Sequence, residues 1–294
     1  MKILLLGKDG QVGHDLQRAL LPLGTVAAHG RATADLRDQD QLAELIGREA
    51  PDVIVNAAAY TAVDKAETDQ ENAFLVNAHA VETLAQHALR QRALLVHYST
   101  DYVFDGTKEG AYLPGDATSP QSVYGASKLA GERAILDSGV AALVLRTSWV
   151  FSAHGRNFVK TMLRLAAERD ALSIVADQFG APTSAELIAE VTAHAIVAHR
   201  GGRLDSGVYH LTASGHTTWH GLARHVVARA IANGATLSAH SDRIAPITTE
   251  QYPVPAKRPH NSRMVTMALQ DALGLEFPDW SVHVDRVVDQ LTLP

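Results

Sequence analysis

Residues 1–20, MKILLLGKDGQVGHDLQRAL, decide the fold of this chain of 294 residues. The apolar run KILLL at 2–6 has the length and composition of a buried strand, and a helical pattern follows it after a short turn. The turn holds Gly7, Gly10 and Gly13, which permit positive φ and a close approach of backbone to ligand, while the N–H groups of the next helix can bind a pyrophosphate. The spacing G-x-x-G-x-x-G in this context favours a dinucleotide-binding unit over an ordinary strand-to-helix turn.

Apolar runs and helical patterns alternate through the first half of the chain. The segments are KILLL (2–6), QVGHDLQRALLPLG (11–24), TVAAH (25–29), QLAELIGREA (41–50), DVIVNAAA (52–59), ENAFLVNAHAVETLAQHALR (71–90) and ALLVHYST (93–100). Because strand and helix follow each other in this βαβ order, we expect an α/β fold with a Rossmann-type, doubly wound parallel sheet covered by helices on both faces.

The alternation loosens after AALVLRTSW at 141–149, where longer connections rich in proline and polar residues begin. These connections, at 176–184 and 241–263, predict a second, smaller substrate lobe. The segments AELIAEVTAHAIVAH (185–199) and GVYHL (207–211) again have the patterns of a helix and a strand, so the lobes interleave in sequence. The predicted boundaries are a dinucleotide-binding domain at 1–150 with a return near 183–212, and a substrate-binding lobe at 151–182 and 213–294.

Composition excludes several classes of function. The 26 Lys and Arg against 32 Asp and Glu give a formal net charge of -6, so the chain has no general attraction for nucleic acid. No cysteine occurs, which excludes disulfides, a thiol nucleophile and cysteine-ligated zinc. The apolar run at the start of the chain is too short for a secretory signal or a membrane span, so we expect a soluble, cytoplasmic protein without a membrane partner.

The end of the second strand bears on cofactor choice. NAD sites usually place an acidic residue about 20 residues after the glycine turn, where it binds the ribose 2′-hydroxyl. Here His29, Gly30 and Arg31 stand in that region. Arg31 has the charge to bind a 2′-phosphate, and the alternative is that it is a solvated loop residue.

Tyr124 and Lys128, in the stretch SVYGASKLAGERA at 122–134, stand at i and i+4 and therefore share one face of a predicted helix. A cation held close to a phenol favours its ionised form, so this tyrosine can exchange a proton with an alcohol or an alkoxide. Thr100 and Asp101 follow a predicted strand, and open α/β sheets bind ligands at the carboxyl ends of their strands. We expect these side chains to meet a substrate oxygen beside the Tyr124 hydroxyl.

Motifs along nearly the whole chain resemble a known family. The glycine turn, NAAAYTAVDKAE (56–67), YSTDYVFDG (98–106), YGASK (124–128) and RTSWVF (146–151) resemble the extended short-chain dehydrogenase/reductase superfamily. More specifically, GKDGQVG (7–13), DQFGAPT (177–183), HLTASGHTTW (210–219) and PVPAKRPHNSR (253–263) are similar to the dTDP-4-dehydrorhamnose reductases. The resemblance implies reduction of the 4-keto group of dTDP-4-dehydro-L-rhamnose to dTDP-L-rhamnose, the last step of dTDP-rhamnose biosynthesis.

The resemblance also implies roles for single residues. Thr100, Tyr124 and Lys128 form the catalytic triad, and Lys128 also holds the nicotinamide ribose. Asp101 and Trp149, together with Thr100 and Tyr124, contact the sugar nucleotide; without the resemblance, Trp149 reads as core. The cofactor-binding residues are Gly7, Gly10, Gln11, Val12, Gly13, Gly30, Arg31, Asp35, Leu36, Ala59, Tyr60, Thr61, Tyr124 and Lys128.

Some members of the family are linked as dimers through magnesium and acidic residues. Glu186 matches one of these residues, and Asp15 stands where glutamate is usual, so Mg²⁺ and a homodimer are further expectations. Gly30 in place of an acid favours NADPH, with NADH as the alternative cofactor.

Two other functions remain open at this point. One is a sugar-nucleotide dehydratase or epimerase of the same superfamily, although dehydratases typically have T-D-E where this chain has Thr100, Asp101 and Tyr102. The other is a non-catalytic NADP-binding regulatory subunit, which an intact set of Thr100, Tyr124 and Lys128 disfavours.

Overall fold

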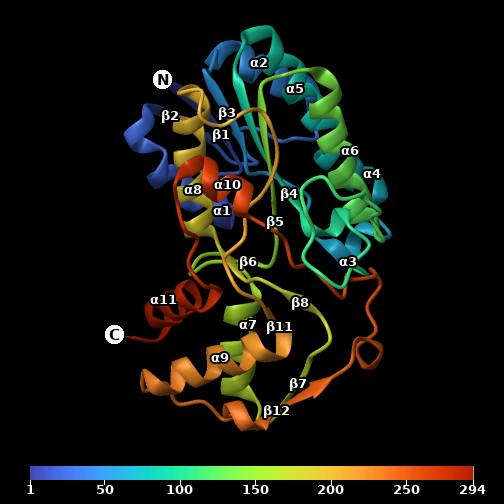
Figure 1. The fold of residues 1–294 in the computed structure, drawn as a ribbon, viewed down its shortest axis with the longest axis vertical. Helices are drawn as coiled ribbons and strands as arrows, with labels where there is room; N and C mark the ends of the chain where they lie inside the picture. Colours follow the sequence, from blue (N-terminus) through green and yellow to red (C-terminus); the bar gives the residue numbers. More distant parts are fainter. Residues whose placement is uncertain (294) are drawn as a thin grey trace.

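A six-stranded parallel sheet organises the molecule, in a computed structural model that describes residues 1–293. The spatial order is β10-β5-β4-β3-β1-β2, so the chain starts next to one edge, adds β2 at that edge, and then crosses β1 to add β3, β4, β5 and β10 on the other side (Figure 1). The strands are β1 (Lys2–Leu6), β2 (Thr25–His29), β3 (Val53–Asn56), β4 (Leu94–Thr100), β5 (Ala142–Thr147) and β10 (Gly207–His210). The predicted α/β class with a doubly wound parallel sheet is confirmed.

Alternating side chains of the strands fill two cores, one on each face of the sheet. In β1, Ile3 and Leu5 join one core while Leu4 and Leu6 join the other, because successive side chains of a strand point to opposite faces. One face is covered by α1 (Gln11–Ala19), α8 (Ala185–Arg200) and α10 (Met267–Leu273). The other is covered by α2 (Gln39–Glu49), α5 (Ala80–Gln91) and α6 (Val123–Ser138).

The chain leaves this sheet and returns to it. The strands β6 (Val150–Phe151) and β9 (Thr183–Ser184) pair in parallel at the junction, and α8 follows β9 directly. Strand β10 then pairs with β5, with Gly207 opposite Leu143. Residues far along the sequence therefore complete the sheet that the first residues begin.

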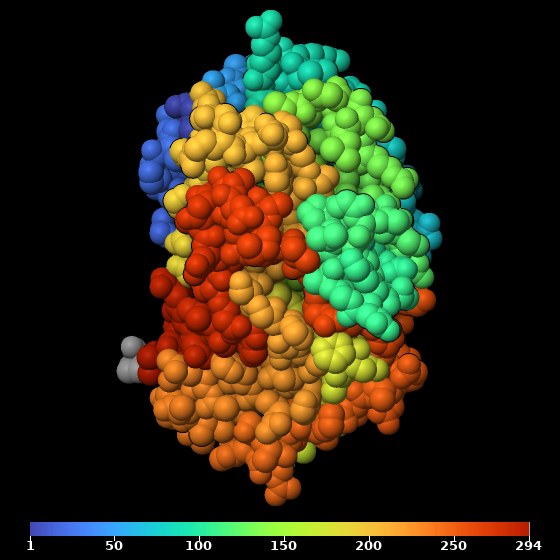
Figure 2. Space-filling view, viewed as in Figure 1, coloured from blue at the N-terminus to red at the C-terminus, as the bar shows by residue number. Residues whose placement is uncertain are grey.

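A smaller lobe lies below the sheet in Figure 1. Its core packs three helices around Phe151, Met162, Val226 and Val287, all of them buried. The helices are α7 (Phe158–Glu168), α9 (Trp219–Ala232) and α11 (Trp280–Thr292). Two strand pairs complete the lobe, β7 (Leu172–Val175) with β12 (Ile244–Ile247) and β8 (Phe179–Gly180) with β11 (Thr217–Thr218). Figure 2 shows the C-terminal residues, in red, extending from this lobe up along the sheet domain.

The helix predicted over 71–90 is interrupted. The chain forms α4 (Gln70–Phe74), a π-helical turn η2 (Leu75–His79) and then α5. Asn77 in this turn accepts from the backbone N–H of Tyr60 at 2.9 Å and donates to the Tyr60 carbonyl at 3.0 Å. A π-turn adds a residue to the helix, which here directs a polar side chain at a loop of the cleft described below.

The remaining elements are short connections. They are η1 (Leu21–Leu23), α3 (Val63–Ala66), η3 (Asp101–Val103), η4 (Ser241–Arg243) and η5 (Thr249–Gln251). Within residues 1–293, no helix combines the length and the apolar character that a membrane crossing would require.

Candidate active site

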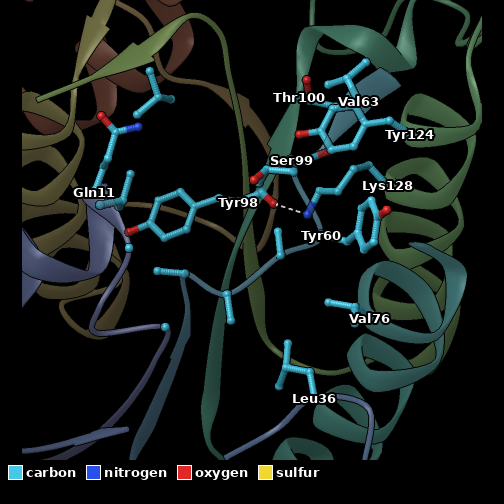
Figure 3. Close-up of a pocket in the computed structure, with 18 of the residues that line it drawn as sticks. Gln11, Leu36, Tyr60, Val63, Val76, Tyr98, Ser99, Thr100, Tyr124 and Lys128 are labelled. Carbon is cyan, nitrogen blue, oxygen red and sulfur yellow. Dashed lines mark hydrogen bonds between the residues drawn. The ribbon is translucent and has the colours of Figure 1, made fainter. Parts of the chain in front are cut away.

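A cleft of about 910 Å³ opens at the carboxyl ends of the strands, between the sheet and the smaller lobe. Figure 3 shows Gln11 on one side of it, Tyr124 and Lys128 on α6 at the opposite side, and Leu36 and Val76 at one end. The predicted site residues that line it are Gly7, Gly10, Gln11, Val12, Arg31, Asp35, Leu36, Ala59, Tyr60, Thr61, Thr100, Asp101, Tyr124, Lys128 and Trp149. Gly13, Gly30 and Glu186 do not line it.

The glycine turn is shaped by contacts that leave no room for side chains. Gly7 has φ of +84°, and a Cβ there would lie 2.6 Å from the Ala58 nitrogen. A Cβ on Gly13 would lie 2.0 Å from the Gly7 carbonyl oxygen, so Gly13 lets α1 start tightly against the turn although it is not on the cleft surface. The turn therefore offers bare backbone to the cleft, as a pyrophosphate site requires.

Two buried hydroxyls at the centre of the cleft have no partner within the described part of the chain. They are Ser99 Oγ, at the end of β4, and Thr147 Oγ1, at the end of β5. A buried polar atom without a partner is costly, so these hydroxyls favour a polar ligand between the two strand ends. Together with the bare glycine turn, they fit a nicotinamide dinucleotide.

Helix α6 positions the tyrosine and the lysine. Ser122 is the N-cap of this helix, which begins at Val123: its Oγ accepts from the Gly125 N–H at 3.2 Å. Tyr124 lies in the first turn and Lys128 one turn later, and both face the cleft (Figure 3). The predicted sharing of one helical face therefore holds in the structure.

The pKa of Tyr124 is raised, whereas the sequence predicts that Lys128 lowers it. The pKa is about 12, because burial and the Asp101 carboxylate raise it by more than a hydrogen bond with Thr100 lowers it. Lys128 Nζ donates to the Tyr98 carbonyl at 2.6 Å and lies 3.1 Å from His97 Nε2. Its pKa is lowered to about 8, mainly by burial. Both of these Nζ contacts are with β4, and the effect of the lysine on the phenol stays a prediction.

Thr100 has its hydrogen bonds committed within the protein. Its hydroxyl accepts from the Tyr102 N–H at 3.2 Å and donates to Asp101 Oδ1 at 2.9 Å. Asp101 also accepts from the Ser262 hydroxyl, which comes from the C-terminal part of the chain. The pKa of Asp101 is about 6, because burial raises it by more than the hydrogen bonds from Ser262 and Thr100 lower it. This carboxyl can change its charge close to neutral pH.

The end of the cleft near β2 carries charges of both signs. Arg37 forms a bidentate ion pair with Asp35, through its Nε at 3.0 Å and its Nη2 at 2.5 Å. Arg31 Nε lies 3.7 Å from the same carboxylate. Arg37 lowers the pKa of Asp35 to about 2 through these hydrogen bonds. A Cβ on Gly30 would lie 1.8 Å from Asp9 Oδ2, so the turn's own carboxylate occupies the space that a side chain at 30 would fill.

Trp149 combines an unusual backbone with a stacked ring. Its φ is +49°, a left-handed conformation that is costly for a bulky residue. The indole stacks on Trp219 at 3.6 Å between centroids, and a Cβ on Gly180 would lie 2.6 Å from it. Trp149 thus belongs both to the wall of the cleft and to the packing of the smaller lobe.

The expected magnesium site is not supported. Glu186 lies outside the cleft, 2.9 Å from Arg286 Nη2 and 3.8 Å from Arg18 Nη2. Asp15 is close enough for Glu186 to raise its pKa, although burial is the larger cause. No group of three or more His, Cys, Asp or Glu side chains with the geometry of a metal site occurs among residues 1–293. Because two guanidinium groups already neutralise Glu186, these side chains do not fit a Mg²⁺ site built from one chain.

The sequence reasoning missed five charged residues of the cleft: Asp9, Arg37, Lys65, Asp69 and Arg156. Asp9 and Arg37 line the cofactor end, and Arg156, in the loop between β6 and α7, lines the cleft with Gly155 near Gln11. Arg37 follows the predicted Asp35 by two residues, so its place in the sequence indicated that it lies near the site. Nothing in the sequence indicated this for Arg156. The loop that holds it reaches the glycine turn only through tertiary packing, in which Asn157 Nδ2 donates to Gln11 Oε1 at 2.9 Å.

Comparisons with known proteins agree with this geometry. The family model described as "RmlD substrate binding domain" matches residues 1–293. A dTDP-4-dehydrorhamnose reductase of Burkholderia thailandensis is 51% identical over 297 residues, covering 99% of each chain. Among solved structures, a dTDP-4-dehydrorhamnose reductase of Clostridium acetobutylicum has a TM-score of 0.91 at 32% identity and covers 100% of both chains. The reductase of Bacillus anthracis in complex with NADP has a TM-score of 0.89 at 30% identity and covers 98% of this chain and 99% of its own.

Proposed function

The chain belongs to the family of dTDP-4-dehydrorhamnose reductases and is an NAD(P)H-dependent oxidoreductase of dTDP-rhamnose biosynthesis, and we propose how its residues reduce the substrate's 4-keto group. The resemblance noted in the sequence is confirmed by these matches. The observation that carries the proposal for the site is one cleft with the glycine turn at one end and Thr100, Tyr124 and Lys128 at the other.

Residues at the carboxyl ends of the strands would hold the cofactor. The turn at Gly7 and Gly10 would bind the pyrophosphate, the loop at 59–61 would border the nucleotide, and Lys128 would bind the nicotinamide ribose. When bound, the reduced nicotinamide supplies a hydride to the 4-keto carbon. The unpartnered hydroxyls of Ser99 and Thr147 support a polar ligand at this place.

We propose NADPH as a cofactor bound at least as well as NADH. Arg31 and Arg37 supply two positive charges beside Asp35, and the side chain of Arg31 is 73% exposed and therefore available to a 2′-phosphate. Asp9, against Gly30, opposes this preference by its own charge. Once Asp35 is ion-paired with Arg37, Arg31 and Asp9 remain with opposite charges, so the preference for the phosphate rests on the exposed guanidinium group of Arg31.

Tyr124 gives the proton in the proposed reaction. Its pKa of about 12 keeps the phenol protonated at neutral pH, so the proton is present when negative charge develops on the 4-oxygen. Thr100 stands beside it, but its hydrogen points to Asp101 while that carboxyl is ionised. Protonation of Asp101 releases the Thr100 hydroxyl to donate to the substrate oxygen.

Trp149 and Asp101 bind the sugar nucleotide in this proposal. The stacked indole pair of Trp149 and Trp219 offers a rigid apolar wall for the sugar. The division into a dinucleotide-binding domain (1–150, with 183–212) and a substrate lobe (151–182 and 213–294) is part of the same proposal, which is supported by the pairing of β10 with β5. The homodimer implied by the resemblance is also part of it, and sedimentation of the pure protein measures it.

The test is an assay of the pure protein with NADPH and dTDP-4-dehydro-L-rhamnose. We expect oxidation of NADPH with formation of dTDP-L-rhamnose, and no consumption of NADPH with dTDP-glucose. Loss of water from dTDP-glucose would indicate a dehydratase instead. Cofactor binding without any turnover of the keto sugar would indicate a regulatory subunit.

A further inference from the structure

A buried chain of hydrogen-bonding groups connects the backbone after β3 to the predicted catalytic lysine. The Ala58 N–H donates to Asn56 Oδ1 at 3.2 Å, and Asn56 Nδ2 lies 3.2 Å from His97 Nδ1. On the other side of the imidazole, His97 Nε2 lies 3.1 Å from Lys128 Nζ. Lys128 Nζ also donates to the Tyr98 carbonyl at 2.6 Å.

The direction of each hydrogen bond in this chain follows from its first member. A backbone N–H can only donate, so the oxygen of the Asn56 amide must face Ala58, and the NH₂ group must face His97. Nδ1 of His97 then accepts, which places the proton of the neutral imidazole on Nε2. This Nε2–H points at Lys128, and an ammonium group has no lone pair with which to accept it. This geometry therefore favours Lys128 as a neutral amine.

The burial of these side chains also favours the neutral amine of Lys128. Asn56 and His97 are each 1% exposed and Lys128 is 2% exposed. Within residues 1–293, no carboxylate forms an ion pair with Lys128. Glu132, one turn further along α6, is engaged by Arg146 through a bond of 2.6 Å from Nη2. An unpaired ammonium in such a place is destabilised by desolvation, so the amine form is favoured.

The surroundings contain several groups that also affect Lys128. Titratable or charged groups on α6, β4, β5 and η3 include Tyr124, Glu132, His97, Tyr98, Arg146, Asp101 and Tyr102. Of these, Glu132 raises the pKa of Lys128, against the larger effect of burial. The pKa of His97 is held well below its usual range mainly by burial, and the charged form of Lys128 lowers it further, so the imidazole is neutral in either state of the lysine.

We propose that Asn56 and His97 are positioning residues that form a tautomer lock, which favours the neutral amine of Lys128 until the nicotinamide cofactor binds. On binding, Nζ leaves the His97 N–H and turns to the ribose hydroxyls, and the lone pair of the neutral amine takes up one proton from solvent. The lysine thus gains its full charge in the complex that reduces substrate. The coupling to the cofactor rests on the function proposed above, whereas the lock is a property of the protein alone.

The lock is tested without cofactor by nitrogen-15 spectra of histidine-labelled protein, in which the two ring nitrogens show which one carries the proton. We expect His97, assigned through its backbone, to be protonated on Nε2 above about pH 8, where Lys128 is a neutral amine. An Nδ1–H form would overturn the lock. In Asn56→Asp the carboxylate can only accept a hydrogen bond, so the proton of the His97 imidazole should move to Nδ1. If the proton stays on Nε2 alone in this variant, Asn56 has no part in the lock.

The coupling is tested by calorimetric titration with NADPH in two buffers of different ionisation enthalpy, at a pH about half a unit above the pKa of Lys128. We expect uptake on the order of one proton for each NADPH bound. His97→Gln should lose this uptake, because its amide oxygen can accept from an ammonium before the cofactor arrives. His225→Gln, at a partly exposed position beside Asp285, is the matched control and should keep it.

The results separate the two proposals. Binding of NADPH without proton uptake, or equal uptake in wild type and His97→Gln, would overturn the coupling while leaving the reductase function intact. Failure of the folded wild type to bind NADPH would count against the proposed function and leave the tautomer lock to be judged by its spectra alone.

Discussion

Thr100 and Asp101 are neighbours in sequence, and the hydroxyl of the first donates to Oδ1 of the second at 2.9 Å. Because the Ser262 hydroxyl holds the other carboxylate oxygen, the side chain of Asp101 is fixed and the Thr100 hydrogen follows it. The hydrogen that a reductase would use to stabilise a developing alkoxide is thus directed elsewhere in the protein while Asp101 is ionised. The charge state of Asp101 therefore affects how much activity a substitution of Thr100 should cost.

Tyr124→Phe should lower kcat by roughly 10²-fold or more, because it removes the proton donor and nothing else. The dissociation constant of NADPH should change little, since the ring remains in place. Stopped-flow turnover and calorimetric binding measure the two effects. Near-normal turnover of the variant would remove Tyr124 from the mechanism.

Below about pH 6, where Asp101 is protonated and the Thr100 hydroxyl is released to the substrate oxygen, Thr100→Val should cost less, about 10-fold to 10²-fold in kcat, because it deletes that one hydrogen bond and leaves the acid in place. Thr100→Ser keeps the hydroxyl and should retain most of the activity. If Thr100→Val is more damaging than Tyr124→Phe in the same assay, the two roles are reversed.

Asp101→Asn should change how stability depends on pH. Burial raises the pKa of Asp101 in the folded protein to about 6, above its value in the unfolded chain, so folding binds a proton and the carboxyl's contribution to stability is lost as pH rises through about 6. From about pH 7 to about pH 5, wild type should gain about 1 kcal/mol in free energy of unfolding relative to Asp101→Asn. Urea titrations of both proteins measure this difference, and parallel pH curves would contradict it.

Arg31→Ala should weaken NADPH binding by about 5-fold to 10-fold and leave NADH binding unchanged, because only NADPH carries the 2′-phosphate. Asp9→Asn is the opposite test: it removes a carboxylate that lies against Gly30, so it should tighten NADPH binding relative to NADH. The measurement is the dissociation constant of each nucleotide for wild type and for the two variants. A clear preference for NADH that neither substitution alters would contradict the proposal that this end of the cleft binds the 2′-phosphate.

Trp149→Ala should raise KM for the sugar nucleotide more than KM for NADPH, because the indole forms the wall of the substrate side. Trp149→Phe keeps an aromatic ring over Trp219 and should show a smaller effect. Equal changes in both KM values would mean that Trp149 acts through the packing of the smaller lobe. Circular dichroism of each variant controls for misfolding.

Much of the fold follows from local patterns. The apolar run at 2–6 and the glycines after it predict the first strand and turn, and in the structure Gly7 has the positive φ that such a turn requires. The face shared by Tyr124 and Lys128 follows from the helical period alone. The interruption at Leu75–His79 was not predictable in this way, because a π-turn keeps the composition of a helix and depends on what Asn77 bonds.

The sequence by itself determined the order of strands and helices, the bare phosphate turn and the residues at the strand ends, because these depend on periods of two and 3.6 residues and on the absence of Cβ atoms. Only the tertiary structure decided which side chains meet: Asp9 against Gly30, Trp149 on Trp219, and His97 between Asn56 and Lys128. These partners lie on different elements, and neighbouring strands bring them together. Their protonation states depend on burial and on the direction of each hydrogen bond, which no sequence spacing specifies.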